Sequence, residues 1–304
     1  MDGRGLGLLV GIDGSEGGDR ALDWAARAAA AQDSSITVAY VISGFGPSDL
    51  PTTAGLRNLD LRAAQAIVDT GVQRAGQATP GLPVTGRRVE GDPATELITL
   101  SADADQVVLG SRGHGGFASL LVGSVATKVA GHAACPVVVV RDDAHPTGPV
   151  VIGIDGSDRG EAALRYGFSY ADRHRLPVRG LHVYHVDPPM ARYLTEAAGA
   201  EVAGTELAGT DAAGAEATAA EAARRSSEQL VGARLRSWQE KYPDVVVEAE
   251  TDIGSPARHL VDLSTTASLL VVGHRGHGRL AGLVLGSVSQ AVLTHAHCPV
   301  VITR

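Results

Sequence analysis

The feature that most constrains the fold of this 304-residue chain is an internal repeat. One segment, 109–140, reads LGSRGHGGFASLLVGSVATKVAGHAACPVVVV and reappears at 272–303 as VGHRGHGRLAGLVLGSVSQAVLTHAHCPVVIT. An earlier pair also matches, with VGIDGS at 10–15 and IGIDGS at 152–157. Because about 150 residues suit one domain, the repeat predicts two copies of one structural unit.

The two copies differ in length. Asp13 and Asp155 lie 142 positions apart, whereas Gly110 and Gly273 lie 163 apart, so the second copy carries 21 additional residues. We place this excess within 187–225, which is rich in Ala, Gly, Thr and Glu. Its first part lacks apolar periodicity and is expected to be a mobile loop. The segment is either a lid or partner-docking element, or a tolerated insertion.

A linker is predicted at 141–149, RDDAHPTGP, because this stretch holds two prolines and a glycine and no apolar pattern. The predicted domains are therefore 1–142 and 149–304.

Within each domain, short β-branched runs alternate with longer alanine-rich segments such as 19–32 and 161–174. This alternation predicts an α/β fold in which each domain has a five-stranded parallel sheet flanked by helices. The expected strands of the first copy are 8–12, 36–42, 84–90, 106–109 and 137–140, and those of the second are 150–154, 178–186, 245–251, 269–272 and 300–302.

Composition excludes several classes of partner. The formal net charge is −8 and the basic residues are scattered, so no nucleic-acid partner is expected. Apolar runs are far shorter than the roughly 20 residues that span a bilayer, so no membrane partner is expected either. The first residues show no charged leader followed by an apolar run, which makes the cytoplasm the expected location. The two cysteines, Cys135 and Cys298, each precede a proline and a valine run and are predicted to be buried.

A glycine pattern follows the fourth predicted strand of each copy. Glycines let the backbone approach a bulky anion, and the helix that opens after the pattern offers unpaired N–H groups and the positive end of its dipole. The same spacing in both copies favours a phosphate-binding loop over an ordinary strand-to-helix connection. Its members are Gly110, Gly113, Gly123 and Ser124, and then Gly273, Gly276, Gly286 and Ser287.

This spacing, G-x2-G-x9-G-[ST], resembles the ATP-binding motif of the universal stress protein family. The resemblance covers nearly the whole chain and implies two tandem adenine-nucleotide alpha hydrolase-like (Rossmann-like) domains. It further implies ATP as ligand, with Mg²⁺ shared among the phosphates, and a role in stress adaptation. The implied site lies at the switch point between the first and fourth strands. The domains are expected to pair antiparallel through their last strands, within one chain or as a homodimer.

The resemblance also assigns individual positions. Asp13 and Asp155 match an aspartate beside the ribose and adenine, and Val41 and Val186 match a residue whose backbone meets the adenine edge. The eight motif glycines and serines match the phosphate cradle. Ser289 matches a further hydroxyl position.

The copies depart from each other at two positions in or near the motif. Ala126 stands where the second copy has Ser289, and Ser111 where it has His274, so the two sites are expected to differ in affinity or pH response.

Some assignments stay open. Asp-Gly-Ser is also good turn and helix-capping chemistry, which would explain the two aspartates without a ligand. His114 and His277, in RGHG, either contact phosphate or are exposed and idle, and the same holds for Arg112 and Arg275.

Three function classes remain. A Walker lysine is excluded because neither lysine, Lys128 or Lys241, follows a glycine, and no set of nucleophile and base stands out. A nucleotide-responsive regulatory protein with an unidentified protein partner is therefore favoured. The alternatives are a slow ATP hydrolase or phosphoryl-transfer enzyme at the same sites, and a nucleotide-free dimerisation scaffold.

Overall fold

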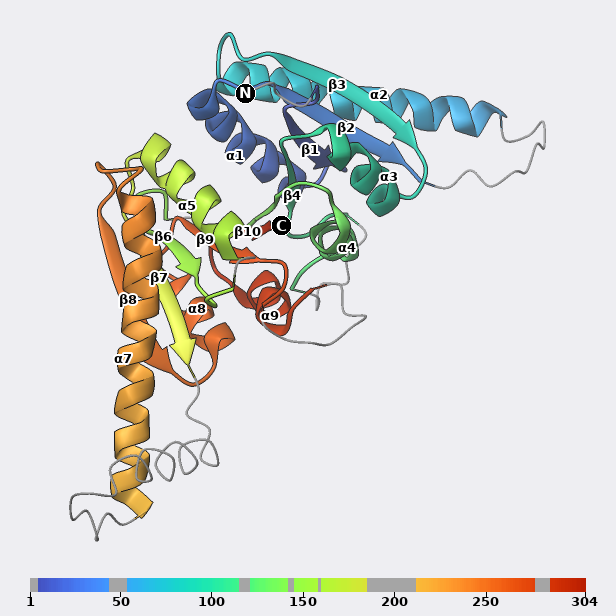
Figure 1. The fold of residues 1–304 in the computed structure, drawn as a ribbon. Helices are drawn as coiled ribbons and strands as arrows, with labels where there is room; N and C mark the ends of the chain where they lie inside the picture. The colour runs from blue at the N-terminus through green and yellow to red at the C-terminus, as the bar shows by residue number, and fades with distance from the viewer. Residues whose placement is uncertain are drawn as a thin grey trace, which may run out of the picture.

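The computed structural model describes seven ranges of the chain, and two helical stretches, 54–59 and 212–219, are described without their side chains. The described ranges are 5–43, 54–114, 121–141, 145–157, 160–184, 212–276 and 285–304. Their strands form one ten-stranded sheet in the order β3-β2-β1-β4-β5-β10-β9-β6-β7-β8 (Figure 1).

The first half of the chain alternates strands and helices as predicted. Its elements are β1 (Leu8–Ile12), α1 (Glu16–Gln32), β2 (Ile36–Ile42), α2 (Ala54–Ala78), β3 (Val84–Glu90), α3 (Pro93–Leu100), the short 3-10 helix η2 (Ser101–Asp103), β4 (Gln106–Gly110), α4 (Ser124–His132) and β5 (Val137–Val140).

The second half repeats this order. Its elements are β6 (Val150–Gly153), α5 (Glu161–His174), β7 (Val178–Tyr184), α7 (Ala212–Gln239), β8 (Val247–Ile253), α8 (Pro256–Leu263), β9 (Leu269–Gly273), α9 (Ser287–His295) and β10 (Val300–Thr303).

Helices cover both faces of the sheet, which is why its central strands read as continuous apolar runs. Successive side chains of a strand point to opposite faces. Leu8 and Val10 therefore belong to the core on the face covered by α1, α2, α5 and α7, whereas Leu9 belongs to the core on the face covered by α3, α4, α8 and α9. All three side chains are fully buried.

Each half has the predicted switch point. In the first, β1 pairs in parallel with β2 on one side and with β4 on the other; in the second, β6 lies in the same way between β7 and β9. The chain thus reverses its winding direction at β1 and β6. The carboxyl ends of these strands border the crevices where doubly wound sheets bind ligands.

The two halves join through their last strands, as expected. β5 and β10 pair antiparallel, with Val138 opposite Val301. Above this joint, Trp24 of α1 stacks on Tyr170 of α5 with ring centroids 5.9 Å apart. Nearby, the hydroxyl of Tyr166 donates to Oε1 of Gln106 in β4 at 2.8 Å.

The largest strand difference in the second half is at β8, which is predicted at 245–251 and spans Val247–Ile253. β8 begins at Val247 rather than at Val245, because Val245 is buried in the preceding turn, where its N–H donates to the carbonyl of Tyr242 at 3.1 Å. β7 is described to Tyr184, and its predicted continuation to Val186 lies outside the described residues.

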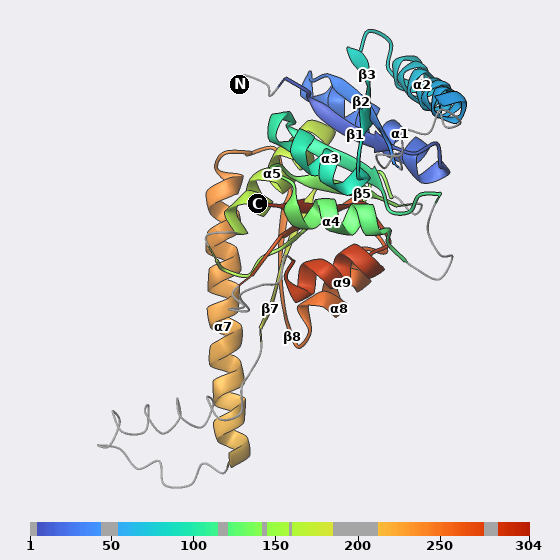
Figure 2. The ribbon, with the colours of Figure 1, turned by 90° about the vertical axis from the view of Figure 1, so that its right-hand side faces the viewer.

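The 187–225 excess is described only in part. Residues 187–211 lie outside the described ranges, but the remainder belongs to α7, which begins at Ala212. Figure 2 shows α7 extending well past the body of its domain. Arg224 pairs there with Glu221 and Glu228, at 2.8 and 2.5 Å. No described helix is both long and apolar enough to cross a membrane.

A histidine at the domain junction gives a pH-dependent prediction. His174 stacks on Tyr170 at 4.1 Å, and burial, followed by the charges of Arg173 and Arg27, lowers its pKa below the ordinary 6.5. The unfolded chain therefore takes up this proton first as pH falls, so the free energy of unfolding should decrease from about pH 6.5 downward. We expect His174→Phe to flatten this decrease in urea unfolding measured from pH 8 to pH 5.

A matched control for this prediction is His132→Gln, because His132 is an exposed histidine on α4. This variant should keep the pH profile of the parent. A His174→Phe profile that is as steep as the parent's would contradict the assignment.

Candidate functional site

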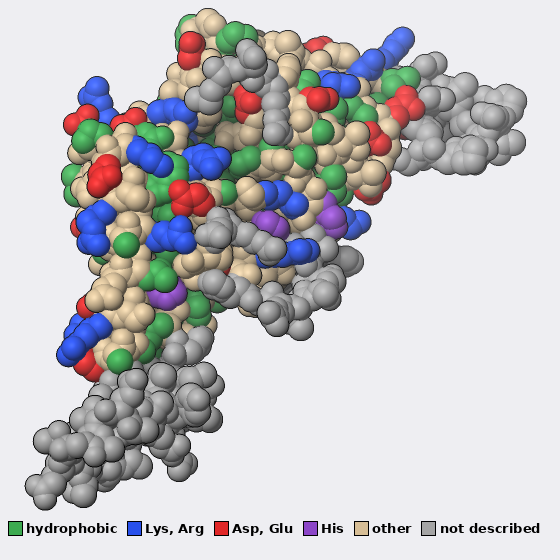
Figure 3. Space-filling model, viewed as in Figure 1, with side chains coloured by type: hydrophobic (Ala, Val, Ile, Leu, Met, Phe, Trp, Pro, Cys, Tyr) green, Lys and Arg blue, Asp and Glu red, His purple; other side chains and the backbone are tan. Residues whose placement is uncertain are grey.

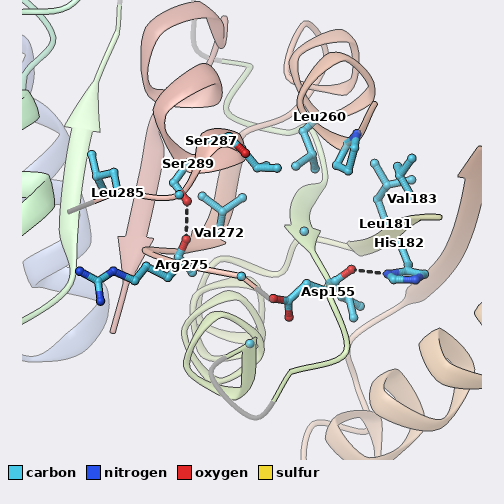
Figure 4. A pocket seen from close by; sticks show the side chains of 18 residues that line it. Asp155, Leu181, His182, Val183, Leu260, Val272, Arg275, Leu285, Ser287 and Ser289 are labelled. Atoms are coloured by element: carbon cyan, nitrogen blue, oxygen red, sulfur yellow. Dashed lines mark hydrogen bonds between the residues drawn. The ribbon is translucent and has the colours of Figure 1, made fainter. Parts of the chain in front are cut away.

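A cavity of about 420 Å³ lies at the switch point of the second half. It lies at the carboxyl ends of β6, β7 and β9, and α8 and the first turn of α9 complete its wall (Figure 4). The cavity has the size of a ligand pocket. Every second-copy motif position contributes to the lining, which includes Asp155, Gly273, Gly276, Gly286, Ser287 and Ser289.

Asp155 is held in place by its own turn. Its Oδ1 accepts from the backbone N–H of Ser157 at 2.9 Å and from the Ser157 hydroxyl at 2.8 Å. Gly156 makes this turn possible because its φ is +80°, which L side chains rarely adopt. Oδ2 faces the glycine loop, where a Cβ added to Gly276 would lie 3.0 Å away.

The first copy repeats this arrangement more tightly. The carboxylate of Asp13 accepts from the N–H of Ser15 at 3.0 Å and from the N–H of His114 at 2.8 Å. A Cβ on Gly113 would lie only 2.1 Å from its Oδ2. Turn chemistry therefore explains the Ser15 contact of Asp13 and the Ser157 contacts of Asp155, while the other side of the Asp13 carboxylate joins the β1 turn to the glycine loop.

The last motif glycines, Gly123 and Gly286, are the N-caps of α4 and α9. Their backbones are extended, with φ of −74° and −67°, and no side chain caps either helix. Each glycine N–H donates to the carbonyl of the loop's second residue, Ser111 or His274, at 2.7 and 2.8 Å. The first-turn N–H groups of both helices are therefore left without a side-chain partner from the cap.

The serines of the motif have distinct environments. Ser124 and Ser287 are exposed at the first positions of their helices. Ser289 is buried, and its hydroxyl donates to the carbonyl of Gly273 at 2.6 Å, which ties α9 to β9. Ala126 makes no such bond, so the two copies hold these helices differently.

The remaining predicted positions are placed only in part. Gly110 ends β4, and Val41 is partly buried near the end of β2. Val186 and His277 lie outside the described residues. The adenine contacts of both valines therefore stay a prediction.

Sequence reasoning missed one polar residue of the cavity wall, His182 of β7. Its Nδ1 donates to the carbonyl of Ile154 at 2.7 Å, which fixes the proton on that nitrogen (Figure 4). An alignment of the two copies singles out this position, because His182 stands where the first copy has Tyr40. The apolar wall was also missed, and it includes Leu181, Val183, Leu260, Val272 and Leu285.

Comparison with protein families decides the relationship. The model of the universal stress protein family matches this chain twice, over residues 8–141 and 147–304. The chain belongs to the universal stress protein family. It is a tandem member, with one family unit in each half. The boundaries at 142 and 149 stay a prediction.

Relatives of this universal stress protein share the tandem length. It is 35% identical to universal stress protein Rv2005c of Mycobacterium tuberculosis, over 98% of this chain and 97% of the relative. A universal stress protein of Mycolicibacterium smegmatis is 33% identical over 98% and 97%. The crystal structure of a universal stress protein from Archaeoglobus fulgidus covers 100% of this chain and 99% of its own, with a TM-score of 0.68 and 20% identity. That similarity shows the fold.

Proposed function

We propose that this universal stress protein binds ATP at the second-half cavity and at the equivalent first-half site, and acts in stress adaptation as a nucleotide-responsive regulator. The observation that carries the proposal is the uncapped glycine at the start of α9. The cavity and the position of the switch point support it.

Gly286 is not required by the packing of the protein itself. Its φ of −67° suits any residue, and an added Cβ would find its nearest neighbour 3.5 Å away, at Arg275. Serine, aspartate or asparagine would cap α9 better. A glycine at an N-cap that has room for a side chain leaves the first-turn N–H groups open to an external anion, such as a phosphate.

The cavity has an apolar part and a polar part, as a nucleotide has a base and phosphates. Leu181, Val183 and Leu260 form an apolar region suited to a base, while the glycine loop and the start of α9 form a polar one suited to phosphates (Figure 4). Asp155 lies between β6 and this loop, where its carboxylate suits hydroxyl donors of a ribose.

The residues fit Mg²⁺ only as a companion of the phosphates. Among the described residues, no group of three His, Cys, Asp or Glu side chains could hold a metal ion. Mg²⁺ is commonly bound through substrate phosphates, waters and one or two carboxylates. The proposed ion would therefore enter with ATP, and it would supply charge neutralisation.

A regulatory role fits the chemistry of the lining better than catalysis. Arg275, Asp155 and His182 line the cavity. Asp155 accepts from Ser157 of its own turn, and His182 donates to the carbonyl of Ile154, just after the neighbouring strand β6. Lys241 lies over the ring of Trp238, 4.0 Å from its centroid, rather than in the cavity wall. A bound nucleotide can bias such a protein between conformations that a partner reads.

The test is to denature the purified protein and to count the adenine nucleotide released per chain, before and after incubation with ATP and magnesium. Two per chain supports both sites, and one supports unequal sites. None after incubation would contradict the proposal and favour the scaffold. Phosphate release that persists through purification and is lost with Gly286→Ser would instead indicate a hydrolase.

We expect Gly286→Ser to weaken ATP binding at the second site about tenfold or more, a loss of about 1.4 kcal/mol, because the new hydroxyl occupies the phosphate position. Stability should be kept or raised by a few tenths of a kcal/mol, since serine caps a helix better than glycine. Calorimetric titration with ATP and urea unfolding measure the two effects.

Gly123→Ser is the matched variant, because Gly123 has the same extended backbone at the start of α4 and an added Cβ would again have its nearest neighbour at 3.5 Å. It should impair only the first site. Unchanged ATP binding in both variants would show that the helix starts do not hold the phosphates.

A further inference from the structure

Two arginines cross between the domains, one directly after β5 and one after β10. Nη2 of Arg304 donates to the carbonyl oxygen of Ala130 in α4 at 3.3 Å. Nη2 of Arg141 donates to the carbonyl oxygen of Leu293 in α9. These are equivalent positions of the repeat, since both pairs lie 163 residues apart. Each domain therefore extends one arginine to a helix of the other.

The carbonyls that receive these arginines have lost their usual partners. In a regular helix the N–H of Ala134 would bond to the carbonyl of Ala130. Instead it donates to the hydroxyl of the buried Ser101 at 2.7 Å. In the second copy the N–H of His297 likewise donates to Ser264 at 2.9 Å. The fold thereby leaves one carbonyl near the end of each helix for the crossing arginine.

Both helices are the ones that begin at the proposed phosphate sites. α4 begins at Ser124 and α9 at Ser287, and each has only nine residues. A bond near one end of so short a helix constrains the orientation of its first turn. Arg304 of the second domain thus supports the helix of the first site, and Arg141 supports the helix of the second.

Each arginine is also connected to the glycine loop of its own domain. The N–H of Ser111 donates to the carbonyl of Val140, next to Arg141, at 2.9 Å. The N–H of His274 donates to the carbonyl of Thr303, next to the other arginine, at 2.8 Å. A continuous route of contacts therefore runs from each loop, through the end of the last strand, to the helix of the other site.

Charge also connects the second glycine loop to Arg304. Burial, followed by the positive charge of Arg275 in the second loop, lowers the pKa of Arg304. A phosphate beside Arg275 would neutralise that charge and favour the charged bond from Arg304 to α4. Figure 3 shows basic and histidine side chains gathered where the two halves meet.

We infer that Arg141 and Arg304 are positioning residues that couple the two nucleotide sites, each transmitting occupancy of its own domain to the phosphate-binding helix of the other. This inference rests on the proposed function. It predicts that ATP at one site raises affinity at the other, by about fivefold, the lower end of typical coupling.

Chains with one working site test whether each arginine supports the phosphate-binding helix of the other domain, and the two-site titration of the parent chain tests the coupling itself. Gly286→Ser leaves the first site, and in that chain Arg304→Gln should weaken ATP binding about fivefold while Arg141→Gln changes it by less than about twofold. Gly123→Ser leaves the second site, where the two arginine variants should exchange their effects. Calorimetric titration measures both, and circular dichroism confirms that each variant is folded.

Arg304→Lys keeps the charge and the aliphatic stem, so it should recover part of the first-site affinity and provides the comparison if the glutamine variant unfolds. In the parent chain, the double variant Arg141→Gln/Arg304→Gln should remove cooperativity from the two-site titration. If an arginine variant changed ATP affinity only in its own domain, or equally at both sites, the inference would be overturned while the proposed function stood. A parent chain that binds no ATP would overturn the proposed function and this inference with it.

Discussion

Phe168→Ala is expected to lower the free energy of unfolding of the second domain by about 3–5 kcal/mol. Phe168 of α5 is fully buried, and its ring lies 6.0 Å from those of Trp238 and Tyr242. Removing it opens a cavity at the contact that holds α7 against α5. Urea unfolding followed by tryptophan fluorescence measures the loss, since Trp238 reports directly on this cluster.

The same variant should also weaken ATP binding at the second site. Trp238 donates to Glu161 at 2.9 Å, and Arg234 donates to the carbonyl of Gly156 at 3.1 Å, in the turn that carries Asp155. A loosened α7 therefore disturbs that turn.

The control for this prediction is Phe168→Leu, which keeps most of the volume and should cost less than about 1.5 kcal/mol. A Phe168→Ala cost no larger than that of Phe168→Leu would show that the aromatic cluster is not the main tether of α7.

Gly110→Ala is expected to abolish ATP binding at the first site and to destabilise its domain by about 1–3 kcal/mol. The added Cβ would lie 2.5 Å from both the carbonyl carbon and the carbonyl oxygen of Gly17 in α1. These are backbone atoms, so the overlap is relieved only if α1 moves away from β4 and takes the adjoining turn with it. Nucleotide counting per chain and urea unfolding measure the two losses.

Gly5→Ala is the matched control, because no atom lies within 4 Å of a Cβ at that position. It should change neither stability nor nucleotide content. Normal ATP binding by Gly110→Ala would show that the close approach of α1 and β4 is not needed for the first site.

The sequence predicted the fold well because buried parallel strands leave a strong signal. Runs such as 137–140 are continuous valine, and the repeat located each strand a second time. The start of β8 was mispredicted for two reasons. β8 is an edge strand and lacks a continuous apolar run. The apolar Val245 is buried in the turn before the strand rather than in the strand itself.

The candidate site was predictable only where chemistry depends on spacing along the chain. The motif glycines of the second copy and Asp155 line one cavity. His182 and the crossing arginines depend instead on which strands become neighbours and in what register. The contact of Arg304 with Ala130 exists only because β5 and β10 pair antiparallel, which residue spacing does not encode.

The β5–β10 joint has a consequence for how such a protein responds to its concentration. Two separate single-domain chains that meet through these strands would come apart on dilution, and a homodimer of them would have two identical halves. Here both strands belong to one chain, so the joint opens and closes as a unimolecular event whatever the expression level. The two halves can also differ in sequence. His274 stands at the position equivalent to Ser111, and Ser289 at the position equivalent to Ala126. One gene product can thus carry two unequal copies of the family unit in a fixed one-to-one ratio.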